Sequence, residues 1–455
     1  MSDKKQRSLF SGKLGYVLSA AGASVGLGNI WRFPYLAARH GGGMFLLVYI
    51  ILVVTFGYTM IMSETALGRM TARSPVGAFA RFGNGLINRL GGWLNAVIPM
   101  LIVPYYSVIG GWVCRYLYAY LRGETAQLAE TETFNSFVGS GSQQILWFLV
   151  FAALVLAVIF MGVEQGIERV SKFMMPVLVI LGIIIAGYSI TRPGALAGVK
   201  YLLVPDFSHF TWMTVVAALG QMFYSLSIAM GILITFGSYM KKDTDMEKSC
   251  VQVEIFDTAI AILAGLMIIP AVFAFSGGSP EALNSGPSLM FLTMPKIFLS
   301  MGFGRLIGIL FFVLVLFAAL TSAIALTESC VSTFEDEFHW GRTKGTLFMA
   351  AVMIGLGALS CLGFNVLSFV RIFGMDFLDF FDFLTNSLMM PVAAMLICLL
   401  ILKVVTPAGI EAEVMASSAF KRRGIYRFVL KYMAIPFLAV ILLSSVASVL
   451  GFIKM

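Results

Sequence analysis

The chain has 455 residues, of which 59% are hydrophobic and only 12% are charged, about half the charged share of an average soluble domain. Its mean hydropathy is +0.92 and its formal net charge is +8. This composition excludes a soluble globule, a disordered chain, a collagen, a coiled coil and a disulfide-rich secreted scaffold.

Eleven stretches of 18 or more residues contain no Asp, Glu, Lys or Arg, and each can cross a hydrocarbon core that needs about 20 apolar residues as helix. They are 14–31, 40–63, 90–114, 133–163, 173–191, 207–240, 258–280, 306–327, 345–370, 383–402 and 432–453. We therefore predict an all-α polytopic membrane protein with 11 transmembrane helices.

Basic residues gather in particular connections, which indicates topology and not a nucleic-acid surface. Arg69, Arg73, Arg81 and Arg89 lie between the second and third stretches with no acidic residue among them. Because basic loops mark the cytoplasmic side, we expect the N-terminus inside and the C-terminus outside. The five cysteines are scattered without a CxxC spacing, which favours buried, reduced thiols. The first stretch lacks a signal-cleavage site and is expected to stay in the protein.

Two stretches are interrupted by small and polar residues at mid-membrane. They are "GASVGLGN" (Gly22 to Asn29) in the first and "GQMFYSLSIAMG" (Gly220 to Gly231) in the sixth. Non-helical backbone at membrane depth is tolerated only where it lines protein or a cavity, and paired breaks in two halves of a chain point to a transporter site.

The positions of the breaks divide the chain into halves of five spans, and five is odd, so the second half is inverted. The predicted organisation is a tail at 1–12, a first repeat at 13–191, a second repeat at 207–404 and an additional span at 426–455.

Several separate motifs then carry a family resemblance. "GLGNIWRFPYLAARHGGG" strongly resembles the first-helix signature of the neurotransmitter:sodium symporters. Further matching pieces, in the same order as in that family, are "SETALGR" (Ser63–Arg69), "YYSVIGGW" (Tyr105–Trp112), "GIERVSKFMMP" (Gly166–Pro176), "GQMFYSLS" (Gly220–Ser227) and "ALTSAIALTESCVSTFEDE" (Ala319–Glu337). The resemblance implies the LeuT fold with a 5+5 inverted repeat, unwound helices 1 and 6, and a place in the cytoplasmic (inner) membrane of a prokaryote.

A hydrolase reading competes for the same residues. Gly22 to Gly26 fits a GxSxG elbow, and His40 to Gly43 fits the HGGG oxyanion motif. An elbow needs a strand before the nucleophile, whereas both flanks here are predicted membrane helix. We expect a transporter and not an enzyme.

The resemblance implies two Na⁺ ions bound by unwound carbonyls and hydroxyls, which suit a hard cation. The first site would comprise Ser24, Asn29, Ser225 and Asp257, completed by the substrate carboxylate. The second would comprise carbonyls of Gly22, Val25 and Ala318 with hydroxyls of Thr321 and Ser322. The alternative for these two hydroxyls is a hydrogen bond to their own helix.

Asp257 is an ionisable residue deep in a span, which is by default functional. Chloride-dependent members of the family have a neutral residue at this position, and the chloride region one turn on is Ala261 here. We expect chloride-independent transport, with Asp257 supplying the negative charge and taking up a proton on the return step.

The resemblance also implies the substrate class. Aminergic members carry an aspartate at the position of Gly26, so Gly26 favours a substrate with its own carboxylate, held by the amides of Leu27 and Gly28 and by the Tyr106 hydroxyl. Ala229 stands where the family usually has glycine, which leaves the pocket depth open. The substrate-binding residues are predicted to be Ser24, Gly26, Leu27, Gly28, Ile102, Tyr106, Tyr224, Ser225, Ser227, Ile228, Met230, Ala323 and Leu326.

An apolar wall with no charge favours a neutral, apolar or aromatic L-amino acid. The alternatives are another small zwitterion, a biogenic amine, or a transport-inactive ligand-sensing receptor. The expected partners are Na⁺, this small molecule and the lipid bilayer, with no nucleic acid and no obligatory protein partner.

Gates are carried over from the family in the same way. The outer gate would pair Arg32 with Asp382, or with Asp379 one turn away. Tyr224 and Tyr106 would form a lid beneath it, and Gln221 and Glu64 would support Arg32. The inner gate would comprise Arg7, Asp336, Ser238 and Tyr239, above Phe10 where the family often has tryptophan.

The spacing of Gly166 and Pro176 predicts a weak point in span 5. In the family this spacing lets the cytoplasmic part of span 5 unwind and hydrate the second sodium site. A plain kink is the alternative.

Overall fold

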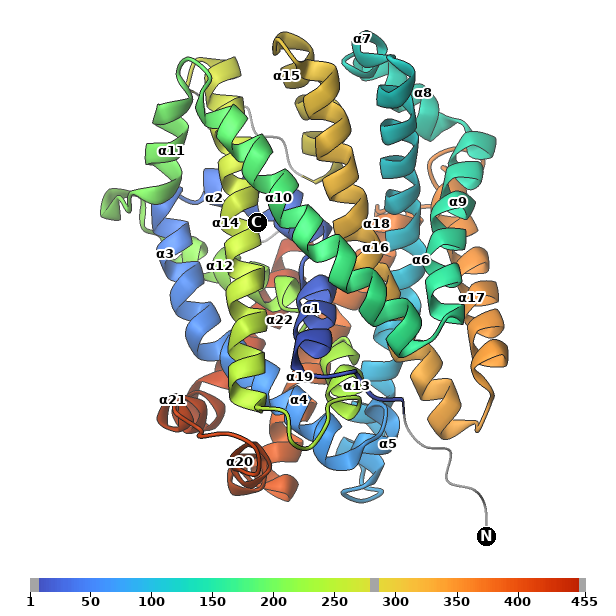
Figure 1. The fold of residues 1–455 in the computed structure, drawn as a ribbon, viewed down its shortest axis with the longest axis vertical. Coiled ribbons are helices and arrows are strands. Elements are labelled where there is room, and N and C mark those ends of the chain that lie inside the picture. Colours follow the sequence, from blue (N-terminus) through green and yellow to red (C-terminus); the bar gives the residue numbers. More distant parts are fainter. Residues whose placement is uncertain (1–7, 279–285, 450–455) are drawn as a thin grey trace.

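The computed structural model describes residues 8–278 and 286–449, and its long elements are all helices (Figure 1). In this part of the chain, nine helical segments are long and apolar enough to cross a membrane. They are α3–α4 (Gly43–Thr71), α6 (Leu86–Arg122), α9 (Gly141–Phe160), Val163–Ile190 with α10 (Arg169–Ile190), α14 (Met246–Ser276), α16 (Gly304–Glu337), α17 (Arg342–Leu362), α18–α19 (Phe377–Val405) and α21–α22 (Arg423–Ser448). The protein is a multi-pass membrane protein.

Two further segments are helical but broken, at the places where the sequence predicts interruptions. The first comprises α1 (Lys13–Ser24) and α2 (Phe33–Arg39), joined through a π-helical turn at Gly28–Arg32. The second comprises α12 (Trp212–Ser225) and α13 (Ile232–Ser238), joined by non-helical backbone. The total of eleven spans and the inverted repeat remain predictions.

Short helices lie between the long segments, and one of them, α8, overlaps the predicted stretch 133–163. They are α5 (Pro75–Ala80), α7 (Thr125–Leu128), α8 (Thr131–Gly139), α11 (Ala195–Leu203) and α20 (Pro407–Met415). α15 (Met294–Ser300), between α14 and α16, has no counterpart in the sequence prediction. The charge-free criterion missed it because its helix is short and Lys296 interrupts it.

Several further boundaries complete the long segments. α3 is Gly43–Leu52, α4 is Tyr58–Thr71, α18 is Phe377–Asp382, α19 is Met390–Leu400, α21 is Arg423–Phe428 and α22 is Ala434–Val449. π-helical turns join the paired pieces, for example at Val53–Gly57 and at Phe383–Met389.

The two broken segments lie in the middle of the bundle, where α10 crosses in front of α1 (Figure 1). Close packing around them depends on glycine. A β-carbon on Gly68 of α4 would lie 1.9 Å from the Ile234 carbonyl oxygen, and one on Gly237 would lie 2.4 Å from the Thr65 carbonyl oxygen. α4 and α13 therefore touch backbone to backbone, as small residues permit in membrane bundles.

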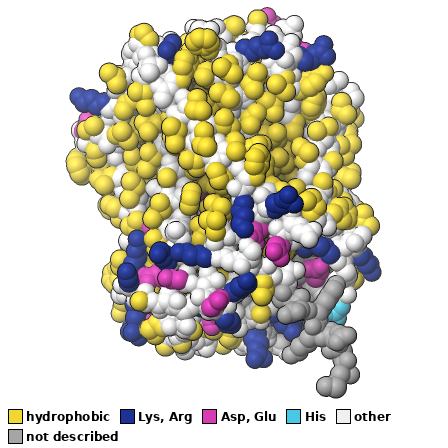
Figure 2. Space-filling model, viewed as in Figure 1, with side chains coloured by type: hydrophobic (Ala, Val, Ile, Leu, Met, Phe, Trp, Pro, Cys, Tyr) yellow, Lys and Arg dark blue, Asp and Glu magenta, His cyan; other side chains and the backbone are white. Residues whose placement is uncertain are grey.

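On the face shown in Figure 2, a broad hydrophobic band crosses the molecule, with most charged side chains below it and a few basic ones above it. The interior is largely apolar but also contains the fully buried carboxyls of Glu64 and Asp257, while many leucines and phenylalanines face outward. A bilayer explains the outward apolar surface, and the buried carboxyls mark the interior as functional.

The charged end is stabilised by Glu411 of α20, which is buried and bound by two arginines of α21. The Arg423 Nε atom donates to one carboxylate oxygen at 2.6 Å, and Arg427 Nη2 donates to the same oxygen at 2.7 Å. Burial raises the pKa of Glu411, but the hydrogen bonds from Arg427 and Arg423 outweigh burial, so its pKa is lowered overall.

This pairing predicts a pH-dependent contribution to stability. A carboxyl with a lowered folded-state pKa stabilises above its unfolded pKa of about 4.3 and loses that effect as pH falls through the folded pKa. The melting temperature of the wild type should therefore exceed that of Glu411→Gln at pH 7, and the gap should close below pH 4. Exposed Glu130→Gln is the matched control, and a gap that stays constant with pH would contradict the pairing.

Candidate functional site

The first break leaves two backbone amides without helical hydrogen bonds, and side chains bind them instead. α1 ends at Ser24, and Val25 takes an extended conformation with φ −73° and ψ 100°. The Gly26 amide then donates to the Asn29 side-chain oxygen at 3.0 Å, and the Leu27 amide donates to the Tyr106 hydroxyl at 3.3 Å. The break is therefore held by side chains and not by a helical ladder.

Glycine is required where this backbone meets its neighbours. A β-carbon on Gly26 would lie 2.7 Å from the Ser322 hydroxyl and 3.1 Å from the Tyr106 hydroxyl, and one on Gly28 would lie 2.5 Å from the Tyr224 ring. An aspartate at position 26 does not fit this arrangement.

The second break contains two non-glycine residues with left-handed backbone. Ser227 has φ 54° and Ala229 has φ 59°, followed by Gly231 at φ 71°. The Ala229 amide donates to Glu64 Oε1 at 2.8 Å, and the Ser227 hydroxyl donates to the Ala23 carbonyl at 3.3 Å. Glu64 thus supports the second break and not Arg32, which corrects the expected role. Gln221 likewise donates to the Gly28 carbonyl at 3.1 Å.

A polar cluster joins both breaks to α14. The Asn29 amide donates to Asp257 Oδ1 at 2.8 Å and to the Ser225 hydroxyl at 2.9 Å, and that hydroxyl lies 2.9 Å from each Asp257 oxygen. Tyr49, which sequence reasoning missed, donates to Asp257 Oδ2 at 3.2 Å. No sequence signal singles out Tyr49, because the stretch 40–63 also contains Thr55, Tyr58 and Thr59. Among the described residues, the buried Ser24 hydroxyl has no hydrogen-bond partner.

The residues predicted for the second sodium site are brought together in part. The Ser322 hydroxyl of α16 lies 3.4 Å from the Gly22 carbonyl oxygen, 3.0 Å from that of Ala23 and 3.2 Å from that of Val25. Thr321 instead donates within its own helix, to the carbonyls of Phe317 at 3.0 Å and Ala318 at 3.2 Å. The alternative stated for the two hydroxyls therefore describes Thr321 but not Ser322.

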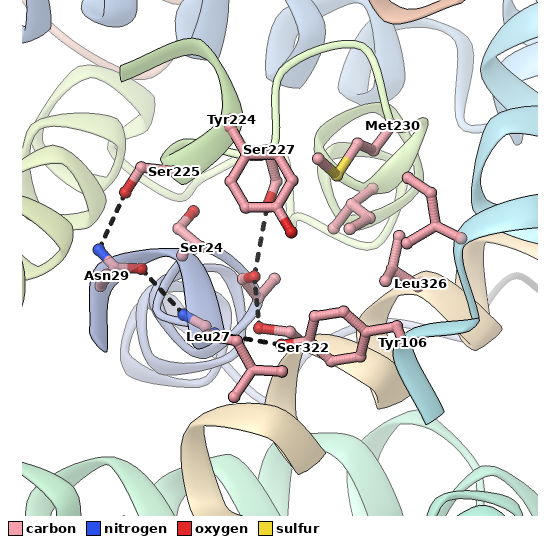
Figure 3. A pocket seen from close by; sticks show the side chains of 15 residues that line it. Ser24, Leu27, Asn29, Tyr106, Tyr224, Ser225, Ser227, Met230, Ser322 and Leu326 are labelled. Carbon is pink, nitrogen blue, oxygen red and sulfur yellow. Dashed lines mark hydrogen bonds between the residues drawn. The ribbon is translucent and has the colours of Figure 1, made fainter. Parts of the chain in front are cut away.

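A small cavity of about 30 Å³ lies between the breaks, with room for about two water molecules. Its wall includes eleven of the thirteen predicted substrate residues, and Asn29 and Tyr106 lie on opposite sides of Leu27 (Figure 3). Ile228 and Ala323 do not line it, while Ile232 and Ala23 do. No Asp, Glu, Lys or Arg is among its lining residues in the described structure.

A larger cavity of about 410 Å³ lies beyond Tyr106 and Tyr224, which border both cavities. Arg32, Asp379 and Asp382 line it. The described structure has no ion pair between Arg32 and either aspartate. The Arg32 guanidinium carbon is 5.3 Å from the Tyr224 ring centre, and Asp382 accepts from Tyr105 and Asn386 at 3.2 and 2.6 Å. Arg32 and Asp382, the predicted outer gate, therefore line the same cavity but do not form an ion pair in the described structure.

At the opposite end of α1, Phe10 fills an aromatic pocket formed by Tyr16, Phe236 and Tyr239. The Tyr239 hydroxyl donates to Glu328 Oε1 at 2.7 Å, and Glu328 pairs with Arg342 at 2.6 Å. Glu328 and Arg342 were missed because Glu328 lies inside α16 and Arg342 begins α17, so their pairing depends on how the two helices pack.

Two other residues of the predicted inner gate, Asp336 and Ser238, form hydrogen bonds outside the predicted gate. Asp336 accepts from the Ser74 amide at 2.6 Å, and Ser238 donates to the Thr235 carbonyl at 2.5 Å. Arg7, the expected partner of Asp336, lies outside the described residues.

Comparisons with known proteins agree with this architecture. The family model described as "Sodium:neurotransmitter symporter family" matches residues 7–140 and 128–451. The chain belongs to this family. It is 35% identical to the sodium-dependent transporter YhdH of Bacillus subtilis, over 99% of this chain and 100% of that one. The similarity to the human sodium- and chloride-dependent GABA transporter 2 is 26% identity over 78% of this chain and 66% of that protein.

A solved structure resembles the whole fold. The crystal structure of MhsT in complex with L-phenylalanine aligns with a TM-score of 0.86 and 35% identity, over 97% of this chain and 100% of that chain. The protein is thus a sodium-coupled transporter of a small molecule with the LeuT fold, and not an enzyme.

The left-handed backbone at Ala229 predicts a stabilising substitution. This conformation costs a residue with a β-carbon roughly 1–2 kcal/mol. Replacement by glycine removes that cost, but the greater freedom of glycine in the unfolded state lowers stability by about 0.5–1 kcal/mol. Ala229→Gly should therefore raise stability by about 0.5–1 kcal/mol, measured by denaturation in lipid nanodiscs. Ala218→Gly within helical α12 should instead lower it, and equal losses in both variants would contradict strain at Ala229.

Proposed function

We propose that the protein imports a neutral, apolar or aromatic L-amino acid together with sodium, by alternating access and without chloride. The observation that carries the proposal is the meeting of two kinds of group at one uncharged cavity. Backbone amides and the Tyr106 hydroxyl can hold a carboxylate, and the Asn29–Ser225–Asp257 cluster beside them can hold a cation.

The cation argument rests on oxygen donors around the first break. Asn29, Ser225 and Asp257 provide an amide oxygen, a hydroxyl and a carboxylate, which are hard ligands suited to Na⁺. The Gly26 amide now uses the Asn29 oxygen, so an ion at this position competes with that hydrogen bond. A substrate carboxylate that takes over the amide would release Asn29 for the ion and so couple the two solutes.

A second sodium site is proposed at Ser322 and Thr321. Three carbonyl oxygens of the first break lie within 3.4 Å of the Ser322 hydroxyl. An ion here would tie α16 to α1, whose relative movement alternating access requires. Sodium would favour the state open to the outside, substrate would close the outer gate, and loss of this ion would open the inner gate.

The side-chain wall supports an apolar substrate. Ile102, Met230, Ile232 and Leu326 line the cavity, and the flexible thioether of Met230 can adapt to different shapes. The cavity must widen to admit a side chain, with Tyr224 moving toward the larger cavity. The resemblance to MhsT, which is solved with L-phenylalanine, supports the same class.

A second candidate is another small zwitterion with a more distant amine. The similarity to a GABA transporter favours it. The proposed orientation in the membrane, with the N-terminus in the cytoplasm of a prokaryote, applies to both candidates.

The substrate class is tested by uptake into proteoliposomes of each of the twenty L-amino acids, GABA and tryptamine, in sodium or potassium medium. Sodium-dependent uptake of apolar amino acids is expected, and Asn29→Ala or Ser322→Ala should reduce it at least tenfold, because each removes an ion ligand. Exposed Asn84→Ala should leave uptake unchanged. Uptake of GABA alone would favour the second candidate, and uptake of tryptamine alone would favour an amine substrate.

Chloride independence is tested by replacing chloride with gluconate. Because the Asp257 carboxylate supplies a fixed negative charge beside the cation, wild-type uptake should be equal in both media. Asp257→Asn should lose most uptake in gluconate, with chloride restoring part of it. Loss of wild-type uptake in gluconate would contradict the proposal.

A further inference from the structure

An apolar groove with a volume of about 470 Å³ opens on the outer surface of the helix bundle. One wall is formed by α3 and the π-helical turn Val53–Gly57, and the other by α21, the π-helical turn Val429–Met433 and α22. The groove shares no lining residue with the two cavities described above. Its volume lies within the range of about 300–1,000 Å³ that is usual for small-molecule sites.

The lining of the groove suits hydrocarbon and not a polar ligand. Thr55 is the only polar side chain among its lining residues in the described structure. The Thr55 hydroxyl already donates to the Ile51 carbonyl at 2.6 Å. The rings of Phe56 and Phe437 stack at 6.0 Å and join the two walls. An extended acyl chain therefore matches this lining better than a ligand with hydrogen-bonding groups.

The groove runs lengthwise from the charged end of the molecule into the hydrophobic band. α21 lies at the charged end, beside α20 (Figure 1). Gly424 of α21 and Phe437 of α22 both line the groove, and 13 residues of helix between them span about 20 Å. At the far end, Val215 of α12 completes the lining. One end of the groove is thus close to charged groups, and the rest is surrounded by apolar side chains.

The end of the groove at Gly424 is rich in positive charge. Its basic residues are Lys421, Arg422, Arg423, Arg427 and Lys431. Lys421 and Lys431 are exposed, and within residues 8–278 and 286–449 neither forms an ion pair. The Lys431 ammonium lies 5.1 Å from the Tyr432 ring centre, and its long stem can extend toward the charged end.

Buried carboxylates neutralise only part of this charge. Glu411 is shared by two of the arginines, and Glu254 pairs with the third. Glu247 accepts the backbone amides of Lys421 and Arg422 at 2.8 and 3.0 Å. Five basic side chains therefore meet three carboxylates, and the excess of positive charge at this end of the groove can bind an anion.

The wall of the groove also touches the second break. A β-carbon on Gly57, which ends the π-helical turn Val53–Gly57, would lie 2.4 Å from the Leu226 side chain and 3.2 Å from the Met222 sulfur. Leu226 is the first residue after α12, where the break begins. A molecule in the groove is therefore separated from the second break by a single helical turn.

We propose that the groove binds one anionic phospholipid, with an acyl chain along the groove and the phosphate group at Lys421 and Lys431. A phospholipid has the same order of charge and hydrocarbon as the groove, and basic segments beside membrane helices attract anionic lipids. The bound chain supports the turn Val53–Gly57 and, through it, the second break. This lipid site does not rest on the proposed substrate or on either proposed sodium site.

The class of lipid is tested by native mass spectrometry of the delipidated full chain in detergent, titrated with dioleoyl phosphatidylglycerol or dioleoyl phosphatidylcholine. One phosphatidylglycerol should bind about tenfold more tightly than phosphatidylcholine, because two lysines face its phosphate. Lys421→Gln combined with Lys431→Gln should remove most of this preference. Lys344→Gln combined with Lys403→Gln, at exposed lysines outside the groove, is the matched control and should keep it.

The place of binding is tested by filling the groove. A β-carbon on Gly424 would meet nothing within 4 Å, so Gly424→Phe fits the fold and puts its ring into the end of the groove. This variant should bind both lipids about tenfold more weakly. Gly355→Phe on α17 is the matched control, since its β-carbon also meets nothing within 4 Å, and it should bind lipid as the wild type does. Melting temperatures confirm that each variant is folded.

Three results would overturn the proposal. Wild-type binding of phosphatidylglycerol by Gly424→Phe would place the lipid outside the groove. Equal affinity of the wild type for the two lipids would contradict an anionic ligand. A dimer mass without bound lipid, lost in Gly424→Phe, would show that a second copy of the chain occupies the groove.

The link to the second break has its own readout, which uses the proposed transport activity. Wild-type uptake should be severalfold faster in vesicles that contain phosphatidylglycerol than in vesicles of phosphatidylcholine alone, and Gly424→Phe should lose this difference. If lipid binds as expected but wild-type uptake is equal in both vesicles, the link to the break is overturned and the lipid site stands. Absence of uptake in every vesicle would contradict the proposed function and not the lipid site.

Discussion

Backbone groups that leave a helix inside a bilayer must find partners within the protein, and the rest of this structure depends on that constraint. Four such groups are satisfied by side chains. Asn29 and Tyr106 accept the amides of the first break, Glu64 accepts the Ala229 amide, and Gln221 donates to the Gly28 carbonyl. Each of these side chains comes from a residue that the family resemblance marks as functional.

The same contacts that stabilise the breaks are those that ions and substrate would replace. Each of these amides already donates a hydrogen bond to a protein side chain. Binding of substrate would exchange that hydrogen bond for one to the substrate, at small net cost in free energy. In the same way, a cation would replace the present hydrogen bonds of the Ser322 hydroxyl and of the Asp257 cluster. Such an exchange of hydrogen bonds would let a narrow cavity take up ions and substrate once it widens.

The breaks were predictable because their causes are local. Glycines at 22, 26 and 28 and the polar residues Ser24 and Asn29 weaken an ordinary membrane helix, and α1 ends at Ser24 before the π-helical turn at Gly28–Arg32. The helix α15 and the partner of Asp257 on α3 were not predictable, since the first is too short for a hydropathy pattern and the second depends on packing between distant segments. The pairing of Arg32 with Asp382 stays a prediction. Both residues line one cavity, and the described structure shows no ion pair between them.

Coupling between sodium and substrate is the central claim of this account, and it is reciprocal by thermodynamic necessity. The most direct measurement is equilibrium binding of radiolabelled sodium to the purified protein, in potassium chloride buffer, with and without a saturating apolar L-amino acid. The account predicts that the amino acid tightens sodium binding, and that sodium tightens amino-acid binding by the same factor. Sodium binding that is indifferent to every amino acid would contradict the shared site at the two breaks.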